Sequence, residues 1–379
     1  MLQVAQFLSI GLLISSSILA LLAGRVKRIP AQPLERILMV AFSWAILVPY
    51  FSGNTVSVLY GILFCLALAS IACLCRDRNP EQVFALFRWV YLALILSILA
   101  TQSQELFASL GGSETREIGL VRYTPLGMHT NQAGFVYGGG VLLFLQQVID
   151  SNRKSQKIIC AIGALACVAI VMAASARAAL LALGVAGLVG MSLLTIRHSA
   201  RFRAILAIGI VSAGALLFVY SFEVGAYLTL ILDLESDTRG LDSGGTGRFE
   251  LWQSGVSLLL SDPIAMLAGS GLRSAGQENI GFYVESSYIN LALEVGIIFA
   301  VIIVSRIIFL AYKLLGNFPN SAEMGNRRMF IGLMLVFAAT QSIFNRYLLA
   351  VGNPYSLVVF FLYVIAELEL RPSPRLTAY

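Results

Sequence analysis

The chain has 379 residues, of which 58% are hydrophobic and 12% are charged. A soluble domain has about 45–50% apolar and about 25% charged residues, so this composition excludes a cytosolic enzyme, a secreted disulfide-bonded scaffold and a disordered protein. The net charge of +6 fits the basic residues that membrane proteins keep on their cytoplasmic side, and it does not indicate nucleic-acid binding. The mean hydropathy of +0.83 and the recurring apolar runs predict a polytopic membrane protein.

Apolar segments of spanning length recur along the chain, since a helix needs about 20 apolar residues to cross a bilayer. We expect an all-α transmembrane bundle with eleven spans, at residues 4–24, 37–52, 54–75, 82–101, 132–150, 158–175, 178–196, 204–222, 286–305, 329–348 and 354–370. Eight of them form a first bundle over residues 1–222, and a large outer loop occupies residues 223–285. The last three form a second bundle over residues 286–379.

The basic residues give the orientation of these spans. Nineteen of the 26 Lys and Arg residues fall in alternate connections, beginning with the connection after the first span. Cytoplasmic loops are the ones enriched in Lys and Arg. The pattern therefore predicts a periplasmic N-terminus and a cytoplasmic C-terminus.

Two long connections, residues 102–131 and 223–285, fall on the outer side in this topology. Within the second, residues 246–260 place Phe249, Trp252 and Val256 at helical spacing, and Leu259 follows. This pattern predicts an amphipathic helix that lies on the membrane surface or caps a cavity. Long loops often contain functional residues.

The basic residues of the outer side are all arginines, which grip phosphate and diphosphate groups bidentately. They are Arg116, Arg122, Arg177, Arg239, Arg248, Arg273 and Arg346. Five of them come from five different outer connections or span ends, namely Arg122, Arg177, Arg248, Arg273 and Arg346. They either converge on one outer cavity that binds an anionic ligand, or each pairs with an outer carboxylate.

Arg177 and Glu285 are the most informative charged residues. Arg177 lies at the tight junction between two apolar spans, where an ionisable group is costly and by default functional, the alternative being a side chain that snorkels to the interface. Glu285 precedes the span after the large loop. It is either a helix cap or a general base at the membrane surface. Glu294 lies within the apolar run and must face the bundle interior.

The Cys and Gly residues of the apolar spans predict helix packing rather than a functional site. The chain has only two His residues, so a His-rich zinc site is not expected, and its five Cys residues lie in apolar runs, where they pack as small hydrophobic side chains. The glycines at positions 138–140 and at positions 184, 187 and 190 lie inside apolar spans. There they predict close helix packing.

Four stretches together resemble the O-antigen ligase/polymerase superfamily, whose members are integral membrane glycosyltransferases that act on polyprenyl-diphosphate-linked sugars. They are RYTPLGMHTNQAG (122–134), SARAALLAL (175–183), TGRFELWQSGVSLLLSDPIAMLAGSG (246–271) and ESSYINLALEVGIIF (285–299). Their order, spacing and loop placement all agree with the family. Ligases have a histidine where this chain has Glu285, and this difference favours the O-antigen or exopolysaccharide polymerase branch.

The resemblance implies a GT-C-like bundle in the bacterial cytoplasmic (inner) membrane that joins undecaprenyl-diphosphate-linked oligosaccharides on the periplasmic side. It also implies a role in polysaccharide or lipopolysaccharide synthesis, with a chain-length regulator and a flippase as usual partners. The expected catalytic residues are Glu285, Arg248 and Arg177. The expected substrate-binding and diphosphate-binding residues are Arg122, Arg273, Arg346, His129, Asn131 and Tyr288. No cofactor or metal is implied, since arginines can supply the positive charge.

Three alternatives stay open at this point. The first is a ligase that transfers glycan to lipid A–core or another acceptor. The second is a transporter or flippase of a lipid-linked anionic substrate, which would place its polar residues near the bilayer midplane, often at broken helices. The third is a structural membrane scaffold, which gives no reason for several outer arginines at span ends.

Overall fold

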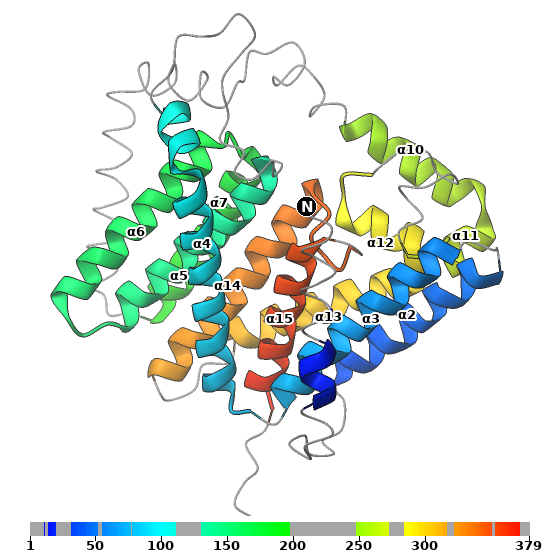
Figure 1. Cartoon of the computed structure of the whole chain (residues 1–379), viewed down its shortest axis with the longest axis horizontal. Coiled ribbons are helices and arrows are strands. Elements are labelled where there is room, and N and C mark those ends of the chain that lie inside the picture. Colours follow the sequence, from blue (N-terminus) through cyan, green and yellow to red (C-terminus); the bar gives the residue numbers. More distant parts are fainter. Residues whose placement is uncertain are drawn as a thin grey trace, which may run out of the picture. The chain divides into compact units, whose positions relative to one another are not determined.

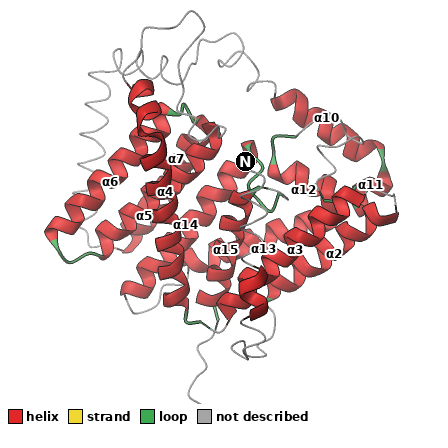
Figure 2. Ribbon diagram, viewed as in Figure 1, coloured by secondary structure: helices red, strands yellow, loops and turns green. Residues whose placement is uncertain are grey.

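The computed structural model describes residues 11, 14–19, 32–51, 55–76, 78–110, 130–197, 248–272, 284–316, 322–350 and 353–371. Over these residues the chain is helical apart from short connections and contains no strand (Figure 2). Within the same residues, seven helices are long and apolar enough to cross a membrane. The prediction of an all-helical, multi-pass membrane protein is therefore confirmed.

Six described helices match predicted spans to within four residues at each end, and three others run seven to eleven residues past a predicted boundary. Figure 1 labels the helices. They are α2 (Pro33–Phe51), α3 (Thr55–Arg76), α4 (Pro80–Leu110), α5 (Thr130–Asp150), α6 (Lys154–Ala173), α7 (Arg177–Arg197), α10 (Arg248–Ser261), α11 (Pro263–Ala268), α12 (Ser287–Val295), α13 (Ile297–Gly316), α14 (Ala322–Phe344) and α15 (Pro354–Glu369). The seven candidate spans lie in α3, α4, α5, α6, α7, α13 and α14. The predicted span 204–222 and most of 4–24 lie outside the described residues, so the total of eleven stays a prediction.

The predicted span 286–305 is two helices in the structure. The helical chain breaks at Gly296, which has φ +86° and separates α12 from α13. A residue with a side chain rarely adopts this left-handed backbone conformation, whereas glycine does so readily. Hydropathy gave one continuous run because apolar residues lie on both sides of the break.

The chain forms two compact units: unit 1 contains residues 1–90 and 250–379, and unit 2 contains residues 91–249. In unit 1, α13 packs against α14, α15, α2 and α12, and α3 packs against α2 and α15. Unit 1 therefore joins helices from the two ends of the described sequence. Figure 1 shows α14 and α15, in orange and red, side by side with α13.

In unit 2, α5 packs against both α6 and α7. A Cβ atom on Gly140 would lie 2.8 Å from Ile95 and 3.1 Å from Cys167, so this glycine allows the close packing that was predicted. The hydroxyl of Tyr91 donates to the carbonyls of Phe135 (3.1 Å) and Val136 (3.0 Å). Gly184 and Gly187 differ from the prediction, because no described atom lies within 4 Å of a Cβ placed there.

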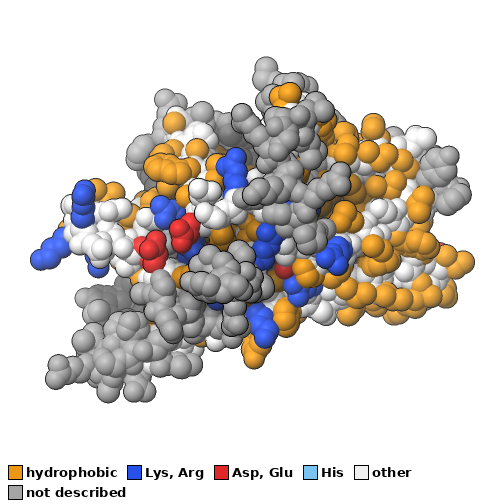
Figure 3. All heavy atoms as spheres, turned by 90° about the horizontal axis from the view of Figure 1, so that it is seen from below, with side chains coloured by type: hydrophobic (Ala, Val, Ile, Leu, Met, Phe, Trp, Pro, Cys, Tyr) orange, Lys and Arg blue, Asp and Glu red, His pale blue; other side chains and the backbone are white. Residues whose placement is uncertain are grey.

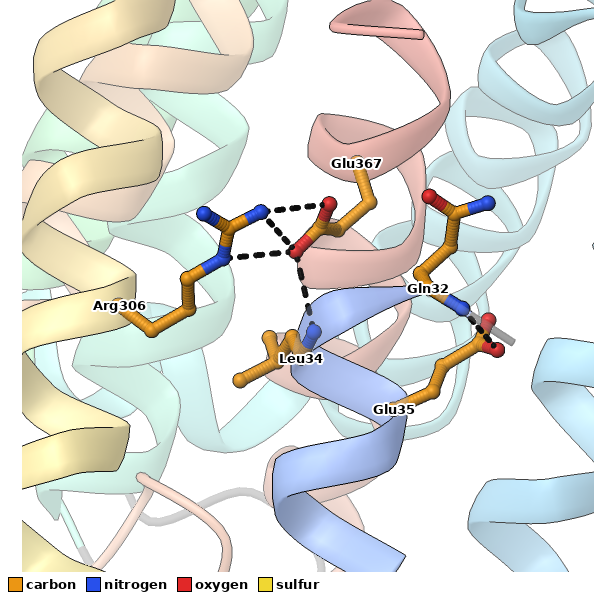
Figure 4. A network of polar contacts seen from close by, with 5 residues as sticks. All are labelled: Gln32, Leu34, Glu35, Arg306 and Glu367. Atoms are coloured by element: carbon orange, nitrogen blue, oxygen red, sulfur yellow. Dashed lines mark hydrogen bonds and ion pairs between the residues drawn. The ribbon is translucent and has the colours of Figure 1, made fainter. Parts of the chain in front are cut away.

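A set of buried carboxylates pairs with arginines in unit 1. Glu367 accepts from Arg306 through Nε (3.0 Å) and Nη2 (2.8 Å) and from the backbone N–H of Leu34 (3.3 Å), and Figure 4 shows the two side chains pointing toward one another. Glu35 pairs with Arg76 at 2.8 Å and also accepts from the backbone N–H of Gln32 at 2.9 Å.

A second carboxylate near the end of α15 holds the start of α14. Glu369, which is 3% exposed, pairs with Arg327 and lies 3.5 Å from the Nε atom of Arg328. Arg327 also lies 3.3 Å from Glu81 at the start of α4. Arg76, Arg306, Arg327 and Arg328 all belong to the predicted cytoplasmic set. Figure 3 shows Lys and Arg side chains gathered near carboxylates, with hydrophobic side chains over a broad flank.

Removing Glu367 should destabilise the protein, because it would leave the Arg306 guanidinium, whose side chain is 21% exposed, with an uncompensated charge. We expect Glu367→Gln to lower the stability by up to about 3–5 kcal/mol, whereas replacing both partners with apolar residues should cost much less. Thermal unfolding of the detergent-purified proteins measures the stability of both variants. The matched control is Glu323→Gln, at an exposed position. A Glu367→Gln midpoint equal to that of the control would contradict this account.

Candidate functional site

Two of the four family-like stretches dock against one another in unit 1. The indole N–H of Trp252 donates to the carbonyl of Glu285 at 3.3 Å. Farther along, the backbone N–H groups of Ser270 and Gly271 donate to the carbonyls of Leu293 (2.7 Å) and Glu294 (3.1 Å). The stretch at 246–271 therefore contacts the stretch at 285–299 at both ends of α12.

Local sequence explains how residues 261–272 reach α12. The Asp262 side chain caps α11 by accepting from the N–H groups of Ile264 (2.9 Å) and Ala265 (3.1 Å), and Pro263 occupies the first turn, as a helix start favours. Gly269 then ends α11 with φ +76°. A Cβ atom at Gly269 would lie 2.5 Å from the Glu294 carbonyl oxygen, so only glycine allows this approach.

The docking satisfies backbone groups that the helix break leaves open. The last carbonyls of a helix have no partner within it, and an unpaired carbonyl in a membrane costs several kcal/mol. Ser270 and Gly271 supply donors to two such carbonyls of α12. The same segment is anchored to α2 and α3, because Trp44 donates to Ala268 O at 2.8 Å and the Ser57 hydroxyl donates to Leu272 O.

The other two family-like stretches dock against one another in unit 2. A Cβ atom on Gly134 would lie 2.5 Å from the Ala176 Cβ and 2.8 Å from the Ala179 Cβ. The first turns of α5 and α7 are therefore side by side. This contact brings Asn131, which is 6% exposed, to the same end of the helix pair as Arg177.

Arg177 follows a tight turn between α6 and α7. Ser175 has φ +49°, and its N–H donates to Met172 O at 2.8 Å, while the N–H of Ala176 donates to Val171 O at 3.2 Å. A non-glycine residue in this region is uncommon and is often found at functional sites. The turn makes Arg177 the first residue of α7, and its side chain is half-buried.

Arg248 has the same kind of position as Arg177. It is the first residue of α10 and is half-buried. It precedes Trp252 by about one turn, so the two residues share a face of the helix. The N-terminus of a helix has a partial positive charge that favours acidic residues or bound anions. An arginine at that position strengthens the positive potential.

Glu285, Tyr288 and Arg346 lie at one end of unit 1. The Ser287 hydroxyl donates to Asn345 O (2.6 Å) and accepts from the N–H groups of Tyr347 (2.9 Å) and Leu348 (3.0 Å). These bonds hold the backbone on both sides of Arg346 against Ser287 at the start of α12. Ser287 lies two residues after Glu285. Glu285 lies before α12 and outside its first turn, so the structure does not make it the helix cap.

The polar residues that build this end were missed by sequence reasoning. Asn345 donates to Gln341 at 3.1 Å, and Asn353 caps α15 by accepting from the N–H of Tyr355 at 3.0 Å. The side chain of Asn353 also donates to Arg346 O. The Asn353–Pro354 pair is a recognisable helix start, but Ser287 and Asn345 meet across 58 residues of sequence, which no local pattern reveals.

Several predicted site residues lie outside the described residues or in different units. Arg122, His129 and Arg273 are outside the described residues. Arg177 and Asn131 belong to unit 2, whereas Glu285, Tyr288 and Arg346 belong to unit 1, so their convergence on one ligand stays a prediction. Glu294 is 3% exposed, which confirms that it faces the interior. Within the described ranges, His, Cys, Asp and Glu do not gather in any group of three or more that could hold a metal ion.

Comparison with models of known protein families gives no match, and a search of curated proteins gives no significant match. The resemblance to the O-antigen ligase/polymerase superfamily therefore rests on the four stretches themselves.

Replacing Gly296 should disrupt the crossing of α11 and α12. A Cβ atom there would overlap the Leu267 carbonyl oxygen and lie 3.2 Å from the carbonyl carbon of Ala268, and the backbone would be strained by about 1–3 kcal/mol. We expect Gly296→Ala to lower the thermal midpoint of the detergent-purified protein by several degrees. Gly187→Ala is the control, because no described atom lies within 4 Å of its Cβ position. Equal midpoints for both variants would show that the crossing is not needed.

Proposed function

We propose that this protein is an O-antigen or polysaccharide polymerase of the bacterial inner membrane. It joins undecaprenyl-diphosphate-linked oligosaccharide repeat units on the periplasmic face and releases undecaprenyl diphosphate. One observation supports this proposal above the others: the described parts of the four family-like stretches dock in pairs. Gly134 lies against Ala176 and Ala179, across 40 intervening residues between the two stretches, and residues 252–271 contact residues 285–294.

The arginines are proposed to bind the diphosphate of the donor. Arg177 and Arg248 each begin a helix, where the helix dipole adds to the charge of the guanidinium. Negative charge develops on the leaving diphosphate as its bond to the sugar breaks, and preorganised positive groups stabilise that charge. Arg122, Arg273 and Arg346 would hold the remaining phosphate oxygens, together with His129 and Asn131. The hydroxyl of Tyr288, the other predicted binding residue, donates to the carbonyl of Ala339 at 2.7 Å, so its proton is not available to a phosphate oxygen.

Glu285 is the proposed general base. Its carboxylate takes the proton from the attacking hydroxyl of the acceptor oligosaccharide, and the resulting oxygen forms a bond to the anomeric carbon of the donor. The bond between that carbon and the diphosphate oxygen breaks, and its electron pair leaves with undecaprenyl diphosphate. A positioned base of this kind contributes about 10²–10⁴-fold. The lipid diphosphate already activates the donor, so the reaction uses no nucleotide sugar.

Two other functions are tested by the same experiment. A ligase would transfer finished glycan to lipid A–core or another acceptor. A transporter or flippase gains support from the break at Gly296 between α12 and α13, because discontinuous helices are common at transport sites.

The experiment is glycan banding in the source organism after deletion of the gene, with complementation by wild type, Arg177→Ala, Arg248→Ala and Glu285→Gln. A polymerase predicts loss of the ladder, with single repeat units still attached to the acceptor. Each of the three variants should fail to restore it. Arg153→Ala and Glu250→Gln, at exposed positions, should restore it fully. Immunoblots of membranes show that all variants are present in equal amounts.

The other outcomes separate the alternatives. Long lipid-linked chains that accumulate without attachment would identify a ligase. Unchanged glycans in the deletion strain would contradict both enzymes and favour transport. A normal ladder from the three variants would keep the polymerase but remove these residues from its site. Arg177→Lys, which keeps the charge but loses the bidentate grip, should restore the ladder only in part.

A further inference from the structure

Helix α10 has three distinct faces. Its inner face packs on the start of α12 and on the residues before it: a Cβ atom on Gly255 would lie 2.9 Å from Val284 and 3.0 Å from Ile289, and Leu259 is 7% exposed. Trp252 lies on the same face and contacts Glu285 O. The sequence pattern grouped Phe249, Trp252, Val256 and Leu259 on one apolar face, which was expected to lie on the membrane surface or to cap a cavity. Phe249 and Val256 are exposed.

The face opposite the buried one is polar. Its residues are exposed and occupy successive turns of the helix, namely Glu250, Ser254, Ser257 and Ser261. A helix with one face packed on protein and the opposite face polar would need no further binding partner in water.

The edge between these two faces is apolar and exposed. Val256 and Leu260 are 41% and 67% exposed, and in α11 Ile264 and Leu267 are 78% and 52% exposed. Exposed apolar surface of this extent in a soluble region marks a site of interaction with lipid or protein. Neither α10 nor α11 is among the candidate spans, so their apolar edge needs another explanation.

This edge continues into the lipid-facing surface of a span. Leu267 lies against Gly296, the residue before α13, whose outward residues Ile298 and Val301 are 54% and 58% exposed. On the other side, the indole of Trp44 donates to Ala268 O at 2.8 Å, and its side chain is exposed. Tryptophan is enriched where the hydrocarbon of a membrane meets the headgroups.

We propose that α10 and α11 form an interfacial membrane anchor, in which Val256, Leu260, Ile264 and Leu267 insert among phospholipid acyl chains while the polar face meets water. Continuity with the lipid-facing residues of α13 identifies acyl chains as the occupant. The anchor also holds Trp252 and the Gly269–Gly271 segment. It thereby fixes the Glu285 end of α12 at the membrane boundary. This inference goes beyond the proposed function and does not depend on it.

Site-specific photocrosslinking tests the proposal in the full-length protein. p-Benzoylphenylalanine is introduced at Leu260 or Ile264 on the apolar edge, at Ser254 on the polar face, or at Val301 on α13 as the lipid-facing reference. All four positions are exposed, so the fold is retained. Each protein is reconstituted in vesicles of phosphatidylethanolamine and phosphatidylglycerol, irradiated, and analysed by intact mass.

The expected result is an added phospholipid mass at Leu260 and Ile264, in yields similar to that at Val301, with a several-fold lower yield at Ser254. Three results would overturn the proposal. Absence of lipid adducts at Leu260 and Ile264 would place the edge in water. Crosslinked dimers at these positions would make it an interface with a second copy. Equal lipid adducts at Ser254 would place the whole helix in hydrocarbon.

Discussion

The break at Gly296 determines how the candidate site of unit 1 is built. A helix that ends inside or beside a membrane leaves carbonyl groups that water does not satisfy. Here the backbone N–H groups of Ser270 and Gly271 bind two of the carbonyls that the end of α12 leaves open. That interaction requires the close crossing of Gly269 and Gly296. It joins the segment before the site to α12, and Trp252 completes the junction at Glu285.

Charged side chains, like open backbone groups, must be compensated where water is excluded. They occur at two kinds of position in the described helices. Buried Glu367 and Glu369 are each paired with arginine, which is the condition for retaining charge in an apolar interior. These arginines therefore have a structural role. Arg177 and Arg248 each begin a helix, where the partial positive charge of the helix end adds to that of the guanidinium and favours a bound anion. The distinction separates arginines that stabilise the bundle from arginines proposed to bind a diphosphate.

Hydropathy predicted six of the described helices to within four residues, because a bilayer imposes a length and a composition that can be read directly. It placed one boundary of α4, α13 and α14 seven to eleven residues away, because these helices extend beyond or begin before the apolar run. Hydropathy missed the break at Gly296, because it scores the transfer of side chains from water to an apolar phase. That transfer free energy does not depend on the backbone angle φ. Periodicity predicted α10 and grouped Val256 with Trp252 and Leu259 on one apolar face, because spacing alone does not show which apolar residues pack on protein and which are exposed. In the candidate site, Arg177 was predicted from the cost of a charge between apolar spans and Glu285 from its position before a span, and both roles stay predictions. Ser287 and Asn345 were not found, because their roles arise only when α12 meets the end of α14.

The most direct test of the central claim is the reaction itself, measured with purified protein in nanodiscs and the lipid-linked repeat unit extracted from the deletion strain. Mass spectrometry follows the products. The account predicts a lipid-linked dimer of the repeat unit together with an equal amount of free undecaprenyl diphosphate, formed by wild-type protein and lost in Arg248→Ala. Unchanged substrate with wild-type protein, under conditions where the substrate binds, would contradict the assignment as a polymerase.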